Sequence, residues 1–370
     1  MSRVEVVVGA AFGSEGKGHI TAQIVEKYAH EIGRQVLNVR VAGPNAGHTV
    51  LDDSLQSFAL RQVPVGAAVD DWVSLYIAPG SEIDMPVLIS EISKLREGGH
   101  AVSNLYVSGE ATLIEDEHKQ EEADRQLNSR LGSTAKGIGA AREARLGRRA
   151  QRLLDDPDAM LALTTIGVTI LKSGEDVRFI DNWLNDPNAA IVVEGTQGYG
   201  LGLHAGFYPY TTSSDCRAID FLAMSGMNPW HPGVENVGVW LVARVFPIRV
   251  AGNSGPLKGE STWEALGLPE EFTTVTKKTR RVGEWDSELV RQAVIANGGP
   301  AKSVFIALTM VDQKFPAIAN LDNDSLGSEV RDRSDDPALV EFIRQIEDEC
   351  LARVAVIGTG PNTVVWKAGF

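Results

Sequence analysis

The stretch VEVVVGAAFGSEGKGHI, from Val4 to Ile20, decides the fold of this chain. It opens with a β-branched run that ends at Gly9, which is typical of a buried strand. A glycine-rich turn follows, and helical spacing then continues from Lys17 to about Ala29. Strand, glycine-rich turn and helix in this order predict a phosphate-binding loop, because backbone N–H groups at the start of a helix can hold phosphate oxygens.

The loop departs from the Walker pattern G-x-x-x-x-G-K-[ST] at two positions. Ala11 stands where the first glycine belongs, and Gly18 stands where the magnesium-binding hydroxyl belongs. Gly16 and Lys17 keep the pattern, and Lys17 would neutralise charge on the terminal phosphates of a nucleotide. The alternative is an ordinary strand–turn–helix corner whose glycines serve packing.

Composition narrows the class of protein. The chain has 370 residues, of which 43% are hydrophobic and 23% charged, as in an ordinary globular protein. A net charge of −14 argues against binding to nucleic acid, although polyanionic small ligands suit local basic clusters. Cys216 and Cys350 lack metal-ligand or redox spacing, which fits a reducing cytoplasm. With no signal-peptide pattern and no apolar run near the ~20 residues that span a bilayer, we expect a cytoplasmic protein.

Strand-like runs alternate with helical stretches along the chain, which predicts an α/β fold with a mostly parallel central sheet covered by helices. Further strands are expected at 35–41, 73–80, 104–108, 189–195, 237–250, 303–312 and 352–358. Helices are expected at 85–97, 287–297 and 337–351. The stretch of about 109–185 is more polar and helix-like, so we expect a helical insertion within a single domain of residues 1–370.

Four clusters carry side chains suited to ligand binding. AGPNAGHT (42–49) follows a strand, where ligands bind in α/β proteins, and VEGTQGYG (193–200) follows another. YPYTTSS (208–214) offers hydroxyl groups, and TTVTKKTRRVGEWD (273–286) mixes cations with threonines, which suits a carboxylate or phosphate. The alternatives are that the histidine of 42–49 is structural, that 193–200 and 208–214 only form turns, and that 273–286 is a solvated charged face.

Together these clusters resemble the adenylosuccinate synthetase family, whose members join aspartate to a 6-oxopurine nucleotide. The resemblance runs from the first strand to the C-terminus and is closer to the shorter archaeal-type members than to the longer bacterial ones. It rests on motifs that keep the family's order: GSEGKG (13–18), NAGHT (45–49), STAKGIG (133–139), EGTQG (194–198), YPYTTSS (208–214), RVAGNSGP (249–256), the loop 273–281 and IGTGPN (357–362).

The resemblance implies a two-step ligase reaction in purine nucleotide biosynthesis. A base removes the purine N1 proton, and the O6 oxyanion takes the γ-phosphate of a nucleoside triphosphate. The amine of aspartate then displaces the 6-phosphoryl group. His48 would act on O6 as an acid, Lys17 would bind phosphate, and Arg148 would reach the substrate 5'-phosphate across a homodimer interface.

The matching motifs imply further residue roles. Catalysis would involve Ser14, Lys17, His48 and Gln197. The triphosphate would contact Gly13, Glu15, Gly16, Lys17, Gly18, His19, Gly47, His48, Thr49, Arg280, Asp312, Gly358, Thr359 and Gly360. The two substrates would contact Ser14, Asn45, Ala46, Gly47, Thr134, Arg148, Gln197, Thr212, Thr274, Val275, Thr276, Lys278 and Arg280. Mg²⁺ would be held by Ser14 and by the backbone carbonyl of Gly47.

One departure from the family pattern points to a changed substrate. The family reads G-D-E-G-K-G, and its aspartate serves as base and magnesium ligand, whereas this chain has Ser14. A serine hydroxyl without activation is a poor base at neutral pH. Because serine is shorter and uncharged, it leaves room beside the purine C2 for the amino group of guanine. This chain therefore resembles the phage branch that makes N6-succino-2-amino-2'-deoxyadenylate from dGMP for DNA containing 2-aminoadenine, which would place it in the host cytoplasm.

Two weaker departures concern the other ligands. The family element T-K-x-D, which reads the guanine of GTP, is TMVD here, with Met310 in place of lysine. We therefore favour ATP or dATP over GTP as the phosphoryl donor. Lys278 replaces an arginine near the substrate ribose, which relaxes the demand for a 2'-hydroxyl or reflects drift at a solvated position.

Two other functions stay open. The first is an ordinary adenylosuccinate synthetase that acts on IMP and GTP with another base, such as a water molecule. The second is a nucleotide-binding regulator without catalysis. A regulator would need only the phosphate loop, so the retained Gln197, Thr212 and Arg148 argue against it.

Overall fold

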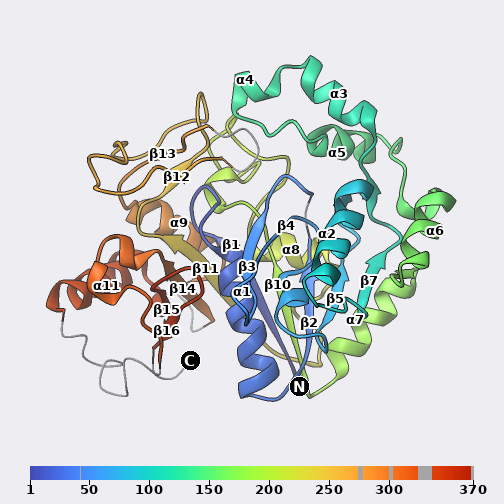
Figure 1. Cartoon of the computed structure of the whole chain (residues 1–370), viewed down its shortest axis with the longest axis horizontal. Coiled ribbons are helices and arrows are strands. Elements are labelled where there is room, and N and C mark those ends of the chain that lie inside the picture. The colour runs from blue at the N-terminus through green and yellow to red at the C-terminus, as the bar shows by residue number, and fades with distance from the viewer. Residues whose placement is uncertain (42, 274–277, 300–302, 324–335, 368–370) are drawn as a thin grey trace. The chain divides into compact units, whose positions relative to one another are not determined.

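The computed structural model describes residues 1–41, 43–273, 278–299, 303–323 and 336–367. Ten strands form one sheet in the order β16-β15-β14-β11-β1-β10-β2-β5-β7-β9 (Figure 1). Seven of its neighbouring pairs are parallel, with a register shift between β14 and β15, and the edge strand β16 is antiparallel to β15. The predicted α/β class with a mostly parallel sheet is confirmed. The strands are β1 (Ser2–Gly9), β2 (Gln35–Arg40), β5 (Ser74–Ile77), β7 (Leu105–Ser108), β9 (Thr169–Leu171), β10 (Ala189–Glu194), β11 (Val234–Arg244), β14 (Val304–Thr309), β15 (Arg353–Gly358) and β16 (Val364–Trp366).

Short strand pairs lie outside this sheet. Their members are β3 (His48–Leu51) with β4 (Ser57–Leu60), β6 (Glu82–Ile83) with β8 (Thr112–Leu113), and β12 (Ile248–Arg249) with β13 (Arg281–Val282). The predicted strand over 237–250 is thus divided, because β11 ends at Arg244 and Ile248 pairs in a different sheet. Pro247 lies between the two segments and has no N–H to donate to a ladder.

Helices occupy most of the segments between strands. The α-helices are α1 (Lys17–Glu26), α2 (Met85–Glu97), α3 (Asp116–Asp124), α4 (Leu127–Leu131), α5 (Ile138–Leu146), α6 (Pro157–Thr165), α7 (Glu175–Asn185), α8 (Ala218–Met224), α9 (Ser287–Ala296) and α11 (Pro337–Cys350). Single turns are η1 (Lys27–Glu31), η2 (Val65–Ala68), η3 (Leu153–Asp155), η4 (Tyr199–Leu201), η5 (Val311–Gln313) and η6 (Pro316–Ile318). The predicted helix 85–97 has the predicted bounds, and the helix after Lys17 continues as the π-helical turn η1.

The chain divides into two compact units, which are described separately below. Unit 1 contains Met1–Val7, Gly18–Thr196 and Ala218–Gly238, and unit 2 contains Val8–Lys17, Gln197–Arg217 and Val239–Phe370. The segment 109–185 lies within unit 1 and contains α3 to α7 together with strand β9. Its independence as a helical insertion, and the single-domain organisation, stay predictions. Among the described residues, no helix has the length and apolar character needed to cross a membrane.

Candidate active site

In unit 2, the loop after β1 contains residues with left-handed backbone conformations. Gly13, Ser14 and Gly16 all have positive φ values, of 80°, 52° and 88°. Gly13 and Ser14 are thus consecutive left-handed residues, and Gly16 is a third. Ser14 is exposed, although only glycine adopts this backbone conformation without a steric cost. Phosphate binding by this loop stays a prediction.

Two oppositely charged side chains are buried inside this loop. The Nζ atom of Lys17 lies 2.9 Å from Oε2 of Glu15, and the two side chains are 3% and 1% exposed. The other oxygen of Glu15 accepts a hydrogen bond from the backbone N–H of Ala11 at 2.5 Å. Glu15 thus fixes both the loop backbone and the position of the lysine ammonium group.

A buried arginine at the end of β11 holds the backbone of Ser14. Nη1 of Arg244 donates to the Ser14 carbonyl at 3.3 Å, and its guanidinium forms a two-atom contact with Glu271 at 2.6 and 3.1 Å. Burial opposes ionisation of Glu271, but Arg244 beside it brings the pKa of that carboxyl below its usual value. Arg280 also approaches Glu271, with Nη1 3.7 Å from Oε2, and burial lowers the pKa of the Arg280 guanidinium.

Further predicted residues of unit 2 lie in loops and turns. Gln197 has a positive φ of 60°, and a Cβ atom on Gly13 would lie 3.5 Å from its Cα atom. Thr212 is half-buried, and its N–H donates to the Leu201 carbonyl. Lys278 is exposed and donates its N–H to Oγ1 of Thr273. Thr274, Val275 and Thr276, expected to bind aspartate, lie outside the described residues.

The residues expected to bind the base of the triphosphate follow β14 and β15. Asp312 is half-buried in η5, and burial raises the pKa of its carboxyl. The backbone N–H and Oγ1 of Thr359 both bond to Thr363, while Asn320 donates its N–H to the Thr359 carbonyl. Gly358 ends β15, and Gly360 follows in the next turn. Oγ1 of Thr309 donates to the Glu15 carbonyl at 2.7 Å, which ties the end of β14 to the phosphate loop.

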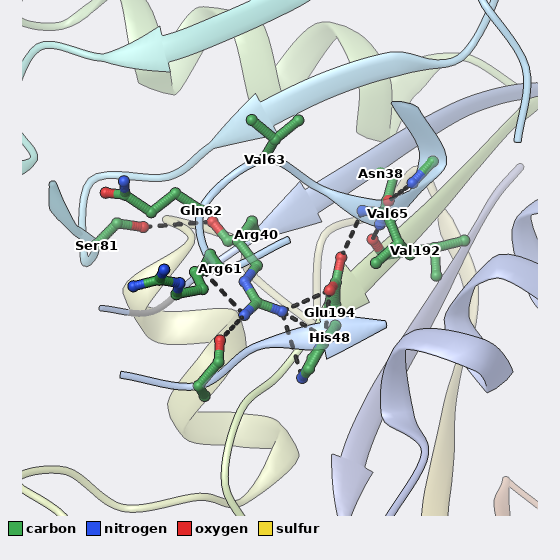
Figure 2. Close-up of polar contacts among 12 residues, drawn as sticks. Asn38, Arg40, His48, Arg61, Gln62, Val63, Val65, Ser81, Val192 and Glu194 are labelled. Carbon is green, nitrogen blue, oxygen red and sulfur yellow. Dashed lines mark hydrogen bonds and ion pairs between the residues drawn. The ribbon is translucent and has the colours of Figure 1, made fainter. Parts of the chain in front are cut away.

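In unit 1, His48 belongs to a buried cluster of three charged or titratable side chains (Figure 2). It lies at the start of β3, Arg40 ends β2, and Glu194 ends the neighbouring strand β10. Nδ1 of His48 contacts Oε1 of Glu194, and Nη1 of Arg40 lies 2.5 Å from the same oxygen. The same Nη1 also lies 2.5 Å from Nδ1 and 3.5 Å from Nε2 of His48.

Backbone groups complete this cluster. Nη2 of Arg40 donates to the carbonyls of Ala46 and Arg61 at 2.9 and 3.1 Å, and Oε2 of Glu194 accepts from the N–H of Val65 at 3.0 Å. Burial penalises charge on Glu194, yet Arg40 and His48 beside it lower the pKa of the carboxyl. The carboxylate is therefore ionised at neutral pH and acts only as an acceptor.

The missing Walker hydroxyl has a steric explanation in this unit. A Cβ atom on Gly18 would lie 2.6 Å from Cβ of His48 and 3.0 Å from the carbonyl oxygen of Thr49. Any side chain at position 18 would therefore displace the start of β3. His19, the next residue of α1, is half-buried.

Other predicted residues of unit 1 occupy two separate segments. Asn45 and Ala46 are half-buried, and Gly47 and Thr49 are exposed. Thr134 is half-buried between α4 and α5. Arg148 is exposed after α5, with a positive φ of 56° and a guanidinium that donates to the Leu146 carbonyl.

Close contacts bring together some of these residues and add others that the motifs did not single out. Within unit 1, His48 contacts Glu194, Arg40 donates to the Ala46 carbonyl, and Gly18 packs against His48 and Thr49. Described hydrogen bonds of Arg148 stay within its own turn. Arg40, Glu194, Arg244 and Glu271 were missed by sequence reasoning. Arg40, Glu194 and Arg244 each end an apolar strand. A charged residue at the end of an apolar run is the sequence feature that could have identified them.

The chain is similar to proteins of known class. A family model described as adenylosuccinate synthetase matches residues 6–165 and 162–319. The adenylosuccinate synthetase of Archaeoglobus fulgidus is 31% identical over 359 residues, which is 96% of this chain and 95% of that protein. The enzyme of Pyrococcus horikoshii is 32% identical over 362 residues, with 96% of each chain covered.

Two solved structures share the fold. The succinoaminodeoxyadenylate synthetase (PurZ) of cyanophage S-2L, bound to dGMP and to dATP as an energy donor, has 28% identity and a TM-score of 0.77. That comparison covers 99% of this chain and 96% of the phage protein. A fully ligated adenylosuccinate synthetase from Plasmodium falciparum has 21% identity and a TM-score of 0.76, over 99% and 100% of the two chains, and shows the fold alone.

Proposed function

The chain belongs to the adenylosuccinate synthetase family of carbon–nitrogen ligases in purine biosynthesis, and we propose that this enzyme joins L-aspartate to dGMP. The product would be N6-succino-2-amino-2'-deoxyadenylate. The observation that carries the proposal is Ser14, an exposed and uncharged residue at the position where the family has its catalytic aspartate. The similarity to a cyanophage enzyme whose structure holds dGMP supports it.

The geometry at Ser14 suits a 2-aminopurine. Arg244 holds the Ser14 carbonyl, so the backbone of this residue is fixed while its hydroxyl is exposed. A hydroxyl can accept a hydrogen bond from the amino group on C2, and it occupies less space than a carboxylate. The loss or gain of one such bond at a buried site is worth ~1–3 kcal/mol, which is roughly 10-fold to 100-fold in selectivity.

The reaction would proceed in two steps. O6 attacks the γ-phosphorus of the triphosphate, the nucleoside diphosphate leaves, and the N1 proton is lost. Because Ser14 is a poor base, we assign that proton to water or to the carboxylate of bound aspartate, with Ser14 as a relay. The amine of aspartate then attacks C6 and phosphate leaves. His48 and Gln197 would act on O6, and the loop lysine, Lys17, would bind the transferred phosphate.

Magnesium fits the residues present if substrate phosphates supply most of its ligands. Among the described residues, no group of three or more His, Cys, Asp or Glu side chains could hold a metal ion. Mg²⁺ commonly takes only one or two protein oxygens and completes its shell with phosphates and water. Ser14 and Gly47 are both exposed, and the proposal assigns each of them as an oxygen ligand. The bound ion would neutralise charge on the transferred phosphoryl group.

For the phosphoryl donor, we propose ATP or dATP. Met310 takes the place of the lysine in the element that reads guanine, and it caps η5 in a left-handed conformation with φ 57°. The dATP in the cyanophage structure agrees with this choice.

A homodimer in which Arg148 contacts the partner's substrate is also part of the proposal. Arg148 is exposed, and Leu146 beside it exposes 77% of its surface. An apolar side chain next to arginines at the end of a helix suits a subunit contact, in which arginine is enriched.

Ordinary adenylosuccinate synthetase activity remains the second candidate, because the archaeal relatives at 31% and 32% identity carry that name. Phosphate release separates the two candidates. Purified enzyme with aspartate, Mg²⁺ and ATP should release phosphate with dGMP and far less with IMP, and omission of aspartate should abolish release. Turnover of IMP with GTP, and not of dGMP, would establish the second candidate instead.

A further inference from the structure

Glu194 is a buried carboxylate that the proposed reaction does not use, and it contacts the proposed acid His48 (Figure 2). Its side chain is fully buried, and that of His48 is 5% exposed. Motif matching assigned a role to the histidine alone. The contact therefore raises the question of what the carboxylate does for the imidazole ring.

Two contacts bear on which ring nitrogen carries a proton, because Glu194 bonds to Nδ1 only if that nitrogen is protonated and Arg40 donates to it only if it is not. Arg40 and His48 keep the pKa of Glu194 low despite its burial, so this carboxylate has no proton to donate. A hydrogen bond between Oε1 and Nδ1 consequently requires a proton on Nδ1. Arg40 has only hydrogen-bond donors. Its Nη1 lies 2.5 Å from Oε1 of Glu194 and 2.5 Å from Nδ1 of His48, so Nη1 and a protonated Nδ1 both donate to Oε1.

The carboxylate itself is held from several elements. Arg40, from β2, donates to Oε1, and the N–H of Val65, at the start of η2, donates to Oε2. Arg40 also spans the carbonyls of Ala46 and Arg61, on the two sides of the β3–β4 hairpin that carries His48. Glu194 can therefore rotate little, and the ring that bonds to it is fixed in turn.

We infer that Glu194, held by Arg40, is a positioning residue that fixes the orientation of His48 and keeps a proton on Nδ1. Nε2 is then the ring nitrogen that exchanges a proton with the substrate, whichever charge state the ring has. Mutation of the partners that orient metal-ligating histidines typically lowers metal affinity or activity about 10- to 100-fold, and we expect an effect of this order here. The inference rests on the proposed role of His48 but not on the choice between dGMP and IMP.

A matched control is available in α2. Glu91, in α2, is 5% exposed and accepts hydrogen bonds from the N–H groups of Arg61, Gln62 and Val63. It braces the same loop as Glu194 but has no described hydrogen bond to His48. A purely structural role for Glu194 predicts that Glu91→Gln and Glu194→Gln have similar consequences.

The test combines kinetics and spectroscopy on the full-length enzyme with the monophosphate that the wild type turns over. Glu194→Gln should lower kcat about 10- to 100-fold with little change in the KM of the monophosphate, whereas Glu91→Gln should change only thermal stability. In a His48→Asn background, Glu194→Gln should cause no further loss of kcat, because residues that act through one another are non-additive. Glu194→Asp, which keeps the charge for Arg40, serves if the glutamine variant does not fold.

Nitrogen-15 NMR of labelled histidines gives a readout that needs no substrate. The His48 signal, assigned as the one missing from His48→Asn, should show a protonated Nδ1 in the wild type and in Glu91→Gln. In Glu194→Gln, or in Glu194→Asp, this Nδ1–H signature should be lost. An unchanged signature in both Glu194 variants, or an equal further loss of kcat when Glu194→Gln is added to His48→Asn, would overturn the inference. If dGMP is not the substrate but these results hold, only the proposed function fails.

Discussion

Gly18 and His48 lie so close together that a Cβ atom on the glycine would be 2.6 Å from Cβ of the histidine. Residue 18 is the position at which a Walker loop carries its magnesium-binding hydroxyl. The first strand of the β3–β4 hairpin occupies the space that such a side chain would need. Gly18, the second residue of α1, thus packs against the histidine, and a hydroxyl-bearing side chain is excluded at this position.

We expect Gly18→Ser, which restores the Walker residue, to impair catalysis. The added side chain would displace His48, and misplacement of a reactive group by about 1 Å can cost ~100-fold in rate. The kcat for the monophosphate substrate measures the effect. Glu26→Ser, at an exposed position of the same helix, is the control and should leave kcat unchanged. A Gly18→Ser enzyme with normal kcat would show that the close contact has no functional consequence.

The pair of Arg244 and Glu271 should stabilise the fold in a pH-dependent way. Arg244 is completely buried, whereas Glu271 exposes 27% of its side chain. Removal of one partner of a buried ion pair lowers the free energy of unfolding by ~3–5 kcal/mol. Because Glu271 is partly exposed, we expect Arg244→Met to lower it by about 3 kcal/mol, the lower end of that range. Arg344→Ala, which breaks an exposed surface pair, is the control and should leave the free energy of unfolding nearly unchanged.

The sign of the pH effect follows from the pKa of Glu271. That pKa is lower in the folded protein than the ordinary value of 4.5, so the pair contributes fully above about pH 4.5. The contribution is lost as pH falls through the folded pKa. Urea titrations measure the free energy of unfolding of the wild type and of Arg244→Met. The difference between the two should therefore shrink below pH 4.5. A difference that stays constant or grows on acidification would contradict the assignment.

Arg148 should act on the substrate of the partner subunit. Arg148→Ala should raise the KM for the monophosphate far more than the KM for aspartate, and Arg149→Ala, at the adjacent exposed position, should not. Mixing Arg148→Ala with His48→Asn chains gives hybrid dimers in which one site has both residues intact. Activity should reappear after mixing if Arg148 acts in trans. No recovery, or a fully active monomer in sedimentation experiments, would refute the shared site.

The fold could be predicted wherever local sequence determines structure. Parallel strands covered on both faces appear as continuous apolar runs, so β1 and β10 were visible. The division between β11 and β12 was missed, because the apolar run continues across the bend and hides the change of sheet at Pro247.

The site could be predicted only where a motif marks it. His48, Lys17 and Ser14 belong to short motifs, and Glu194 opens the EGTQG motif without a role assigned to it. Their partners are distant in sequence, because Arg40 and Glu194 are 154 residues apart and Arg244 and Ser14 are 230 apart. Such contacts depend on how the strands are ordered in the sheet, which no local pattern reveals. A charged residue that ends an apolar strand is the feature that these missed residues share, because the carboxyl ends of parallel strands form the binding edge of an α/β sheet.

The central claim is that Ser14 selects a 2-aminopurine, and its substitution tests this most directly. Ser14→Asp places a carboxylate beside the C2 position, while Ser103→Asp adds the same charge at an exposed serine in the loop before β7. Ser14→Ala removes the hydroxyl without adding charge. The wild type and these three variants are assayed under the same conditions, with ATP, Mg²⁺ and aspartate at saturation.

The decisive measurement is the ratio of kcat/KM for dGMP to kcat/KM for IMP. We predict a ratio well above 1 in the wild type and in Ser103→Asp, by roughly 10-fold to 100-fold, because one hydrogen bond is worth ~1–3 kcal/mol. Ser14→Ala should lower the ratio, and Ser14→Asp should erase or reverse it. Equal kcat/KM values for dGMP and IMP in the wild-type enzyme would contradict the account and restore ordinary adenylosuccinate synthetase activity as the best reading.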